Sequence, residues 1–316
     1  MFHVEHVASE TNRHLCNPLL IQTHPGSILG AGHRTPAHIF RSDNRMSRIL
    51  AVTNQKGGVG KTTTAINVAT ALPLVGQRVL LVDLDPQGNL TSGVGLKGQT
   101  ASAGTAYQAL TSPEPSEDAS QFVLDTRVKN LSLIPADRNL TGAEVELVPL
   151  PQREQRLRLL LEPLRDGYDF IFIDTPPSLG LLTLNALVAA DAVLIPLNCE
   201  YFALEGLADL VATLRRVRGA LNPALDIAGV LMTMYDERTN LGQQVARDIR
   251  EFFQDRVFAT VIPRNIRLGE APSHGLPAIL YDPKSRGAEA YVALARELLE
   301  RTAAAISAPA SESQHG

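Results

Sequence analysis

Short apolar runs alternate with longer amphipathic segments from about residue 46 to about residue 303. Runs such as Val79-Leu80-Leu81-Val82 and Val193-Leu194-Ile195 are apolar at every position, which is typical of strands covered on both faces. This alternation predicts an α/β fold, a doubly wound and mostly parallel sheet flanked by helices. We expect strands at 48–53, 78–83, 131–134, 169–173, 191–196, 226–233 and 257–261. We expect helices near 61–75, 103–110, 152–165, 179–189, 204–219, 240–253 and 284–303.

The two ends of the chain lack this pattern. Residues 1–45 are rich in His, Pro and Gly without sustained periodicity, and they lack the basic, apolar and small-residue order of a targeting signal. We interpret 1–45 as a disordered or untranslated leader and 304–316 as a disordered tail. Residues 46–303 are then expected to form a single domain.

Composition narrows the classes of protein that fit. With 44% hydrophobic and 20% charged residues over 316 positions, the chain can bury a large core, and no run is long enough to span a membrane. Its net charge of −4 excludes a globally basic nucleic-acid coat, so any DNA contact needs a local patch. Cys16 and Cys199 are too few for a metal motif or a disulfide framework, which favours a reducing cytoplasm.

A glycine-rich loop joins the first predicted strand to the first predicted helix. Backbone N–H groups in such a loop, backed by a helix N-terminus, form a site for phosphate, to which Lys61 adds a mobile positive charge. The hydroxyl of Thr62 is a ligand suited to Mg²⁺. The usual motif has glycine where this chain has Gln55, and Lys56 follows it. The loop reads Lys56-Gly57-Gly58-Val59-Gly60-Lys61-Thr62-Thr63.

The glycines of this loop and Lys56 also have simpler interpretations. A glycine-rich turn can connect a strand and a helix without binding anything, but here strand, turn and helix occur in the order that a phosphate loop requires. Lys56 taken alone could be a solvated loop residue. A lysine is also a flexible point charge suited to reaching a phosphate, and the loop does not reveal whose phosphate that is.

Three aspartates follow predicted strands. Asp83, Asp85 and Asp174 lie where the carboxyl ends of parallel strands line one crevice. Asp174 closes an apolar run and can hold Mg²⁺ directly or through water, although an Asp can also cap a strand-to-loop junction. Asp83 and Asp85 point to the same side of an extended chain, so we expect both to face the phosphates.

Several ordered blocks resemble the ParA/Soj family of chromosome-partitioning ATPases, which carry a deviant Walker A motif. Similarity extends from about Met46 to about Arg301. The blocks are 54–67 (NQKGGVGKTTTAIN), 82–89 (VDLDPQGN), 170–178 (FIFIDTPPS), 261–275 (VIPRNIRLGEAPSHG) and 281–288 (YDPKSRGA). The resemblance implies an ATPase that uses ATP and Mg²⁺.

The resemblance also implies roles for individual residues. Lys56, Lys61 and Asp85 are the expected catalytic residues, with Asp85 orienting the attacking water and Lys56 reaching the phosphates of a second subunit in an ATP-dependent homodimer. Thr62 and Asp174 are expected at the metal, Asp174 through water. The nucleotide is expected to contact residues 56–63, and its base to contact Pro263 and Asn265. A turn with a local Asn hydrogen bond is the competing interpretation of Asn265.

Family resemblance further implies binding to nonspecific double-stranded DNA and to a ParB-type centromere-binding protein, at the nucleoid and not at a membrane. The expected DNA contacts are Arg238, Arg264, Arg267 and Lys284, each of which could instead be a solvated surface residue. Contacts of this kind address phosphates and are sensitive to salt. Alternatives are a relative that positions another cargo and a MinD-like membrane-associated regulator, although this chain lacks a basic amphipathic C-terminal helix.

The first six residues suggest an origin for the leader. ParB-type proteins of the resembling systems recognise an inverted repeat, parS, and one reading frame of its core translates as Met-Phe-His-Val-Glu-His. Residues 1–6 have this sequence. We therefore expect an in-frame centromere site upstream of a functional start at Met46, and coding DNA without that palindrome would exclude the hypothesis.

Overall fold

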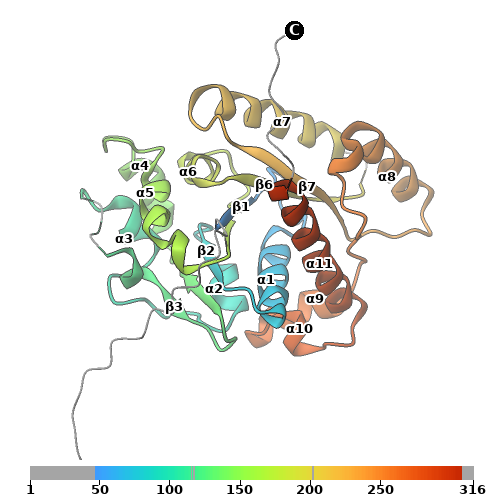
Figure 1. Cartoon of the computed structure of the whole chain (residues 1–316), viewed down its shortest axis with the longest axis horizontal. Coiled ribbons are helices and arrows are strands. Elements are labelled where there is room, and N and C mark those ends of the chain that lie inside the picture. The colour runs from blue at the N-terminus through green and yellow to red at the C-terminus, as the bar shows by residue number, and fades with distance from the viewer. Residues whose placement is uncertain (1–46, 115, 117, 201–202, 308–316) are drawn as a thin grey trace, which may run out of the picture. The chain divides into compact units, whose positions relative to one another are not determined.

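A seven-stranded sheet forms the centre of the computed structural model (Figure 1). The structure describes residues 47–114, 116, 118–200 and 203–307, so the predictions for 1–45, for Met46 and for 308–316 lie outside the described residues. The sheet order is β3-β4-β2-β5-β1-β6-β7, and all neighbours are parallel except the short antiparallel pair of β3 and β4. The predicted doubly wound α/β class is confirmed. The strands are β1 Arg48–Val52, β2 Val79–Asp83, β3 Leu124–Asp125, β4 Leu131–Ile134, β5 Phe170–Asp174, β6 Ala192–Asn198 and β7 Asp226–Thr233.

One predicted strand, 257–261, is wrong. Val257 forms an isolated parallel bridge with Val230, and the Phe258 N–H donates to the Val230 carbonyl at 2.9 Å, but residues 258–261 do not continue this bridge as a strand. The N–H groups of Ala259 and Thr260 donate instead to the carboxylate of Glu297, at 2.8 and 2.9 Å. A side chain distant in sequence thus satisfies the backbone groups that a neighbouring strand would have used.

The predicted helices of the domain are present, with shifted ends. The first α-helix stops at Ala71 and continues as a 3₁₀ turn, Leu72–Val75, in which Pro73 lies at the start, as expected from its missing N–H. The last helix continues to Ser307, four residues past the expected end of the domain at 303. The α-helices are α1 Lys61–Ala71, α2 Asn89–Gly93, α3 Ala106–Thr111, α4 Leu140–Glu146, α5 Arg156–Leu161, α6 Leu181–Ala189, α7 Ala203–Ala220, α8 Asn240–Phe253, α9 Ile266–Glu270, α10 Ala278–Tyr281 and α11 Arg286–Ser307. The 3₁₀ turns are η1 Leu72–Val75, η2 Ala119–Phe122, η3 Glu162–Gly167, η4 Gln254–Arg256 and η5 Ala271–His274.

Each face of the sheet buries its own hydrophobic core. On β1, Ile49 and Ala51 pack with α3 to α8, whereas Leu50 and Val52 pack with α1, α2, α10 and α11. The first and last helices, α1 and α11, lie side by side on the second face (Figure 1). Side chains that alternate between two cores explain why the strands are apolar at every position. Among the described helices, none is long and apolar enough to cross a membrane.

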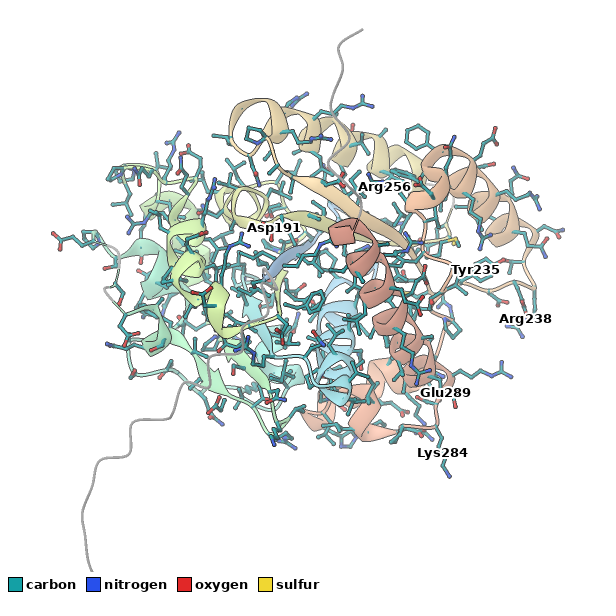
Figure 2. All side chains as sticks on the ribbon, viewed as in Figure 1. Asp191, Tyr235, Arg238, Arg256, Lys284 and Glu289 are labelled. Atoms are coloured by element: carbon teal, nitrogen blue, oxygen red, sulfur yellow. The ribbon has the colours of Figure 1, made fainter. Side chains whose placement is uncertain are left out.

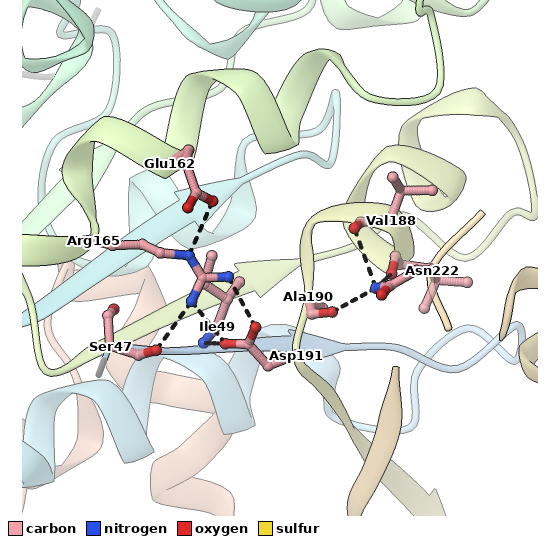
Figure 3. A network of polar contacts seen from close by, with 9 residues as sticks. Ser47, Ile49, Glu162, Arg165, Val188, Ala190, Asp191 and Asn222 are labelled. Atoms are coloured by element: carbon pink, nitrogen blue, oxygen red, sulfur yellow. Dashed lines mark hydrogen bonds and ion pairs between the residues drawn. The ribbon is translucent and has the colours of Figure 1, made fainter. Parts of the chain in front are cut away.

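A polar network ties the amino ends of β1 and β6 together (Figure 3). Asp191 accepts hydrogen bonds from the N–H of Ile49 at 2.7 Å and from both terminal nitrogens of Arg165, at 3.0 and 2.8 Å. Arg165 also donates to the carbonyl of Ser47, and its pKa is raised mainly by its hydrogen bond with Asp191. The buried side-chain amide of Asn222 donates to three carbonyls at the end of α6 and beyond. These contacts fix the strand ends opposite the glycine-rich loop.

Candidate functional site

The glycine-rich loop leaves the carboxyl end of β1 and enters α1. Gly58 and Gly60 have φ values of +72° and +86°, in the left-handed region where glycine carries no Cβ penalty. The buried hydroxyl of Thr233, at the end of β7, donates to the carbonyl of Val59 at 2.8 Å and anchors the loop. The loop therefore presents the N-terminus of an eleven-residue helix in the arrangement that favours an anion.

Lys61 is the first residue of α1 and is buried, with only 7% of its surface exposed. Its ammonium donates to the carbonyl of Lys56 at 3.3 Å, within the loop itself. Burial lowers the pKa of Lys61, and the negative charges of Asp174 and Asp85 oppose that shift. The Lys61 ammonium is therefore partly removed from water, and a bound anion would stabilise its positive charge.

Asp174 ends β5 and contacts the first turn of α1. Its Oδ2 accepts a hydrogen bond from the hydroxyl of Thr62 at 2.7 Å, while its Oδ1 is buried without a partner among the described residues. Burial and the nearby charge of Asp83 raise the pKa of Asp174 well above its ordinary value. An orphaned carboxylate oxygen beside a threonine hydroxyl fits a divalent cation, because hard cations take oxygen ligands.

The described residues contain no cluster of three or more His, Cys, Asp or Glu side chains able to hold a metal. A Mg²⁺ ion at Thr62 and Asp174 would therefore share its coordination with water and with phosphate oxygens, as this ion commonly does. The donor set thus matches a metal that arrives together with a nucleotide rather than a metal site made by protein alone.

The two aspartates after β2 differ in their surroundings. Asp83 is fully buried and accepts hydrogen bonds from the N–H and hydroxyl of Thr91, at 2.9 and 2.7 Å, and from the N–H of Asp85 at 3.1 Å. Burial raises its pKa to about 6. The oxygens of Asp83 thus hold the start of α2, and the expectation that Asp83 faces the phosphates stays a prediction. Asp85 remains partly exposed, and among the described residues its carboxylate accepts only the N–H of Gln87, at 3.0 Å.

Lys56 turns toward the carboxyl end of β6. Its ammonium forms an ion pair with Glu200 at 2.8 Å and lies 3.4 Å from the side-chain oxygen of Asn198. Its backbone N–H donates to Asn54, whose amide in turn donates to the carbonyl of Pro196. The Lys56 side chain thus contacts the end of β6, while its backbone carbonyl accepts the Lys61 ammonium.

The expected base-contacting residues lie after a second bridge to the sheet. Pro263 pairs with Tyr235 in an isolated parallel bridge, which places the 263–265 segment beyond the carboxyl end of β7. The side chain of Asn265 accepts the N–H of Arg267 at 2.9 Å and caps α9. The local hydrogen bond that competes with base contact is therefore present, although the amide nitrogen of Asn265 is not used by it.

All four residues expected to contact DNA are exposed. Figure 2 shows Arg238 and Lys284 pointing outward on the same side of the view. Arg238 pairs with Asp236 at 2.7 Å, and Arg267 pairs with Glu270 and Asp282 at 2.8 and 3.3 Å.

Carboxylates thus neutralise part of this surface. Among the described residues, Arg264 and Lys284 form no ion pair. These two residues are the cations that the surface leaves most available to a phosphate backbone.

Sequence reasoning did not identify several supporting residues. The loop or Lys56 is positioned by Asn54, Thr233 and Glu200, which lie 2, 174 and 144 positions from the residues they contact. The sequence could have indicated them because they lie at the carboxyl ends of β1, β7 and β6, the edge of such sheets where ligands bind.

Comparison with known proteins identifies the family. A sequence model described as an AAA domain matches residues 47–227. The sporulation initiation inhibitor protein Soj of Bacillus subtilis is 55% identical over 253 residues, covering 80% of this chain and 98% of Soj. The chromosome partitioning protein ParA of Myxococcus xanthus is 54% identical over 256 residues, covering 81% of this chain and 89% of that protein.

A solved structure has the same fold. Cobyrinic acid a,c-diamide synthase from Mycobacterium smegmatis, crystallised with bound ADP and magnesium, superposes with a TM-score of 0.71 at 38% identity, covering 82% of this chain and 97% of that one. Together with the loop, the buried lysine and the orphaned aspartate, these similarities show that the chain belongs to the ParA/Soj family of chromosome-partitioning ATPases.

Proposed function

We propose that this ATPase binds ATP with Mg²⁺ at the carboxyl edge of β1 and β5, as a switch for DNA partitioning. The main support is the contact between Thr62 and Asp174 beside the phosphate loop, which leaves one buried carboxylate oxygen without a partner among the residues that the structure describes. Residues 57–63 would hold the phosphates through backbone N–H groups and Lys61. When bound, Mg²⁺ neutralises charge on the phosphate oxygens.

Hydrolysis then depends mainly on positioning, because phosphoryl transfer needs little covalent chemistry from the protein. Asp85 is suited to orient the attacking water, since it is partly exposed next to the loop and its carboxylate accepts only one N–H from the described part of the chain. Asp83 supports this residue by accepting the Asp85 N–H and by holding α2 through Thr91. A site arranged in this way suits a slow reaction that a partner protein accelerates.

Lys56 is proposed to act between two subunits. Its ammonium contacts Asn198 and Glu200 at the end of β6, and we propose that it exchanges these contacts for the triphosphate of a second copy of the chain. ATP would then join two subunits, and hydrolysis would release them. A two-fold dimer also presents each basic surface twice.

The DNA-binding part of the proposal rests on exposed cations. Arg238, Arg264, Arg267 and Lys284 would contact phosphates of nonspecific duplex DNA in the ATP-bound dimer. A ParB-type protein bound at a centromere would stimulate hydrolysis and release the DNA. The family to which the chain belongs, the exposure of these side chains and the absence of ion pairs at Arg264 and Lys284 among the described residues support this part.

Co-sedimentation of the full chain with nonspecific duplex DNA tests the switch. We expect binding with ATP but not with ADP, persistence of binding in Asp85→Ala, and a steep fall with added salt. The double variant Arg264→Ala, Lys284→Ala should lower the salt dependence by about one unit of slope for each lost contact. DNA binding that ignores the nucleotide, or none in any nucleotide state despite hydrolysis, would contradict the proposal.

A further inference from the structure

The carboxyl end of β6 holds the glycine-rich loop and Lys56 at the same time. The carbonyl of Pro196 accepts the side-chain amide of Asn54, whose oxygen accepts the N–H of Lys56 at 3.0 Å. Two and four residues after Pro196, Asn198 and Glu200 face the Lys56 ammonium at 3.4 and 2.8 Å. The backbone of Lys56 is thus fixed by one contact, and its charged end is held separately by two others.

Glu200 supplies the charge in this arrangement. Asn198 is buried and neutral, whereas the side chain of Glu200 is 54% exposed and ionised. The pKa of Glu200 is lowered, first by its hydrogen bond with Lys56, with further contributions from the charge of Lys56, a hydrogen bond with Asn198 and the charge of Arg264. The carboxylate therefore interacts with the charge of the loop lysine and with that of Arg264, a cation of the proposed DNA-binding surface.

A contact with Glu200 opposes the role proposed for Lys56. The Glu200 carboxylate, at 2.8 Å, compensates the charge of the Lys56 ammonium. If Lys56 reached a triphosphate while still paired with Glu200, the negative carboxylate would lie close to the negative phosphates. The contact must open before Lys56 can reach the phosphates of another subunit. Because Glu200 is more than half exposed, water can replace the lysine, and the opening is reversible.

We propose that Glu200 is a positioning residue that holds Lys56 within its own subunit and thereby raises the ATP concentration needed for dimerisation. The inference rests on the proposed role of Lys56 between subunits. Two such contacts open for each dimer that forms. The ion pair thus favours the single chain, and the positive charge of Arg264 stabilises the carboxylate that Lys56 leaves behind.

Titration of ATP into the full-length chain at fixed protein concentration, followed by light scattering, tests this proposal. All proteins carry Asp85→Ala so that bound ATP persists. Glu200→Gln should lower the half-maximal ATP concentration by about three- to tenfold at low salt, because two weak exposed pairs are lost per dimer. Near 1 M salt the difference should shrink, because salt weakens exposed ion pairs.

Two companion variants give the result its meaning. Glu162→Gln removes another exposed glutamate, paired with Arg165 at 3.2 Å, and should leave the titration unchanged. Lys56→Ala should abolish ATP-dependent dimerisation. If Lys56→Ala does so but Glu200→Gln matches Glu162→Gln or needs more ATP, the inference is overturned and the proposed function stands. If the reference protein does not dimerise with ATP, the proposed function fails and the inference fails with it.

Discussion

The two edges of the sheet treat polar groups in opposite ways. At the amino edge, the carboxylate of Asp191 is used by the Ile49 N–H and by Arg165, and the amide of Asn222 reaches three carbonyls (Figure 3). At the carboxyl edge, Asp174 is fully buried and one of its oxygens has no partner in the described part of the chain, and Lys61 has its pKa lowered by burial. The first arrangement stabilises the fold, and the second leaves charge for a ligand to satisfy.

The difference between the edges shows where the protein loses folding stability to keep polar groups unpaired. A buried polar group without a partner costs more than a satisfied group contributes, so natural proteins concentrate such groups at functional sites. The amino edge has one exception, the hydroxyl of Ser47, but that group is neutral and its burial costs less than that of a carboxylate. The contrast between charged groups at the two edges therefore marks the site without reference to any relative.

Removing the functional groups of the carboxyl edge should have the largest effect. We expect Lys61→Ala and Asp85→Ala each to lower ATP hydrolysis by about 100-fold or more, because charge neutralisation and water positioning supply most of the rate. Single-turnover hydrolysis measures the loss. Asp85→Ala should retain ATP binding. Hydrolysis within about threefold of the wild-type rate in either variant would contradict the assignment.

The next largest effect should be a pH-dependent loss of stability caused by the buried Asp83 at the carboxyl edge. Asp83 has a folded-state pKa raised from 3.8 to about 6, so the folded state binds its proton more tightly than the unfolded state. The cost of ionising Asp83 is absent below about pH 4, grows as pH rises, and is complete above about pH 6, where it reaches about 3 kcal/mol at most.

Comparison with Asp83→Asn isolates this cost. Without nucleotide, the free energy of unfolding of the wild type minus that of Asp83→Asn should fall between pH 4 and pH 7. Urea unfolding followed by circular dichroism at several pH values gives the difference, and steric effects of the amide cancel because they do not depend on pH. A flat difference would show that Asp83 is not strained by its burial.

Disrupting the amino edge should have a smaller and different effect. Asp191→Ala removes a hydrogen bond of 2.7 Å to the Ile49 N–H and the ion pair with Arg165 at 2.8 Å. Because the Asp191 side chain is 40% exposed, water replaces part of the loss, and we expect destabilisation of about 1–2 kcal/mol. Hydrolysis per folded molecule should be unchanged. A variant of wild-type stability with lost hydrolysis would break the distinction between the edges.

The smallest expected effect concerns the support of the loop. Thr233→Val removes the buried hydroxyl that donates to the Val59 carbonyl at 2.8 Å. We expect a loss of about 1 kcal/mol, which appears as several-fold weaker ATP binding in calorimetry. Thr233→Ser keeps the hydroxyl and is the matched control. Equal affinities in Val and Ser variants would mean that the loop does not need this anchor.

Much of the fold could be predicted because strand patterning here is a local property. Runs such as Val79-Leu80-Leu81-Val82 are apolar at each position because both faces of the sheet are covered, and Pro73 ends α1 by its own chemistry. The 257–261 segment has similar apolar residues, but Glu297 takes its backbone N–H groups. The two-residue strand β3 is too short to give a pattern.

For the candidate site too, some features could be predicted from the sequence and others could not. Residues 56–63 and Asp174 could be placed at one edge of the sheet from the sequence because each follows a recognisable apolar strand, and their role in nucleotide binding stays a prediction. The bonds of Asp83 to Thr91 could not be predicted, because strand alternation predicts a direction and not the partner that competes for it. The pairing of Lys56 with Glu200 joins residues 144 positions apart, and nothing in the local sequence of either residue reveals it.

Sedimentation velocity of the full-length Asp85→Ala chain measures directly whether ATP joins two subunits. We expect a dimer with ATP and Mg²⁺, a monomer with ADP and Mg²⁺, and a monomer with ATP when Lys56→Ala is added. A mass that is the same in ATP and ADP, or a dimer that persists without Lys56, would contradict this expectation.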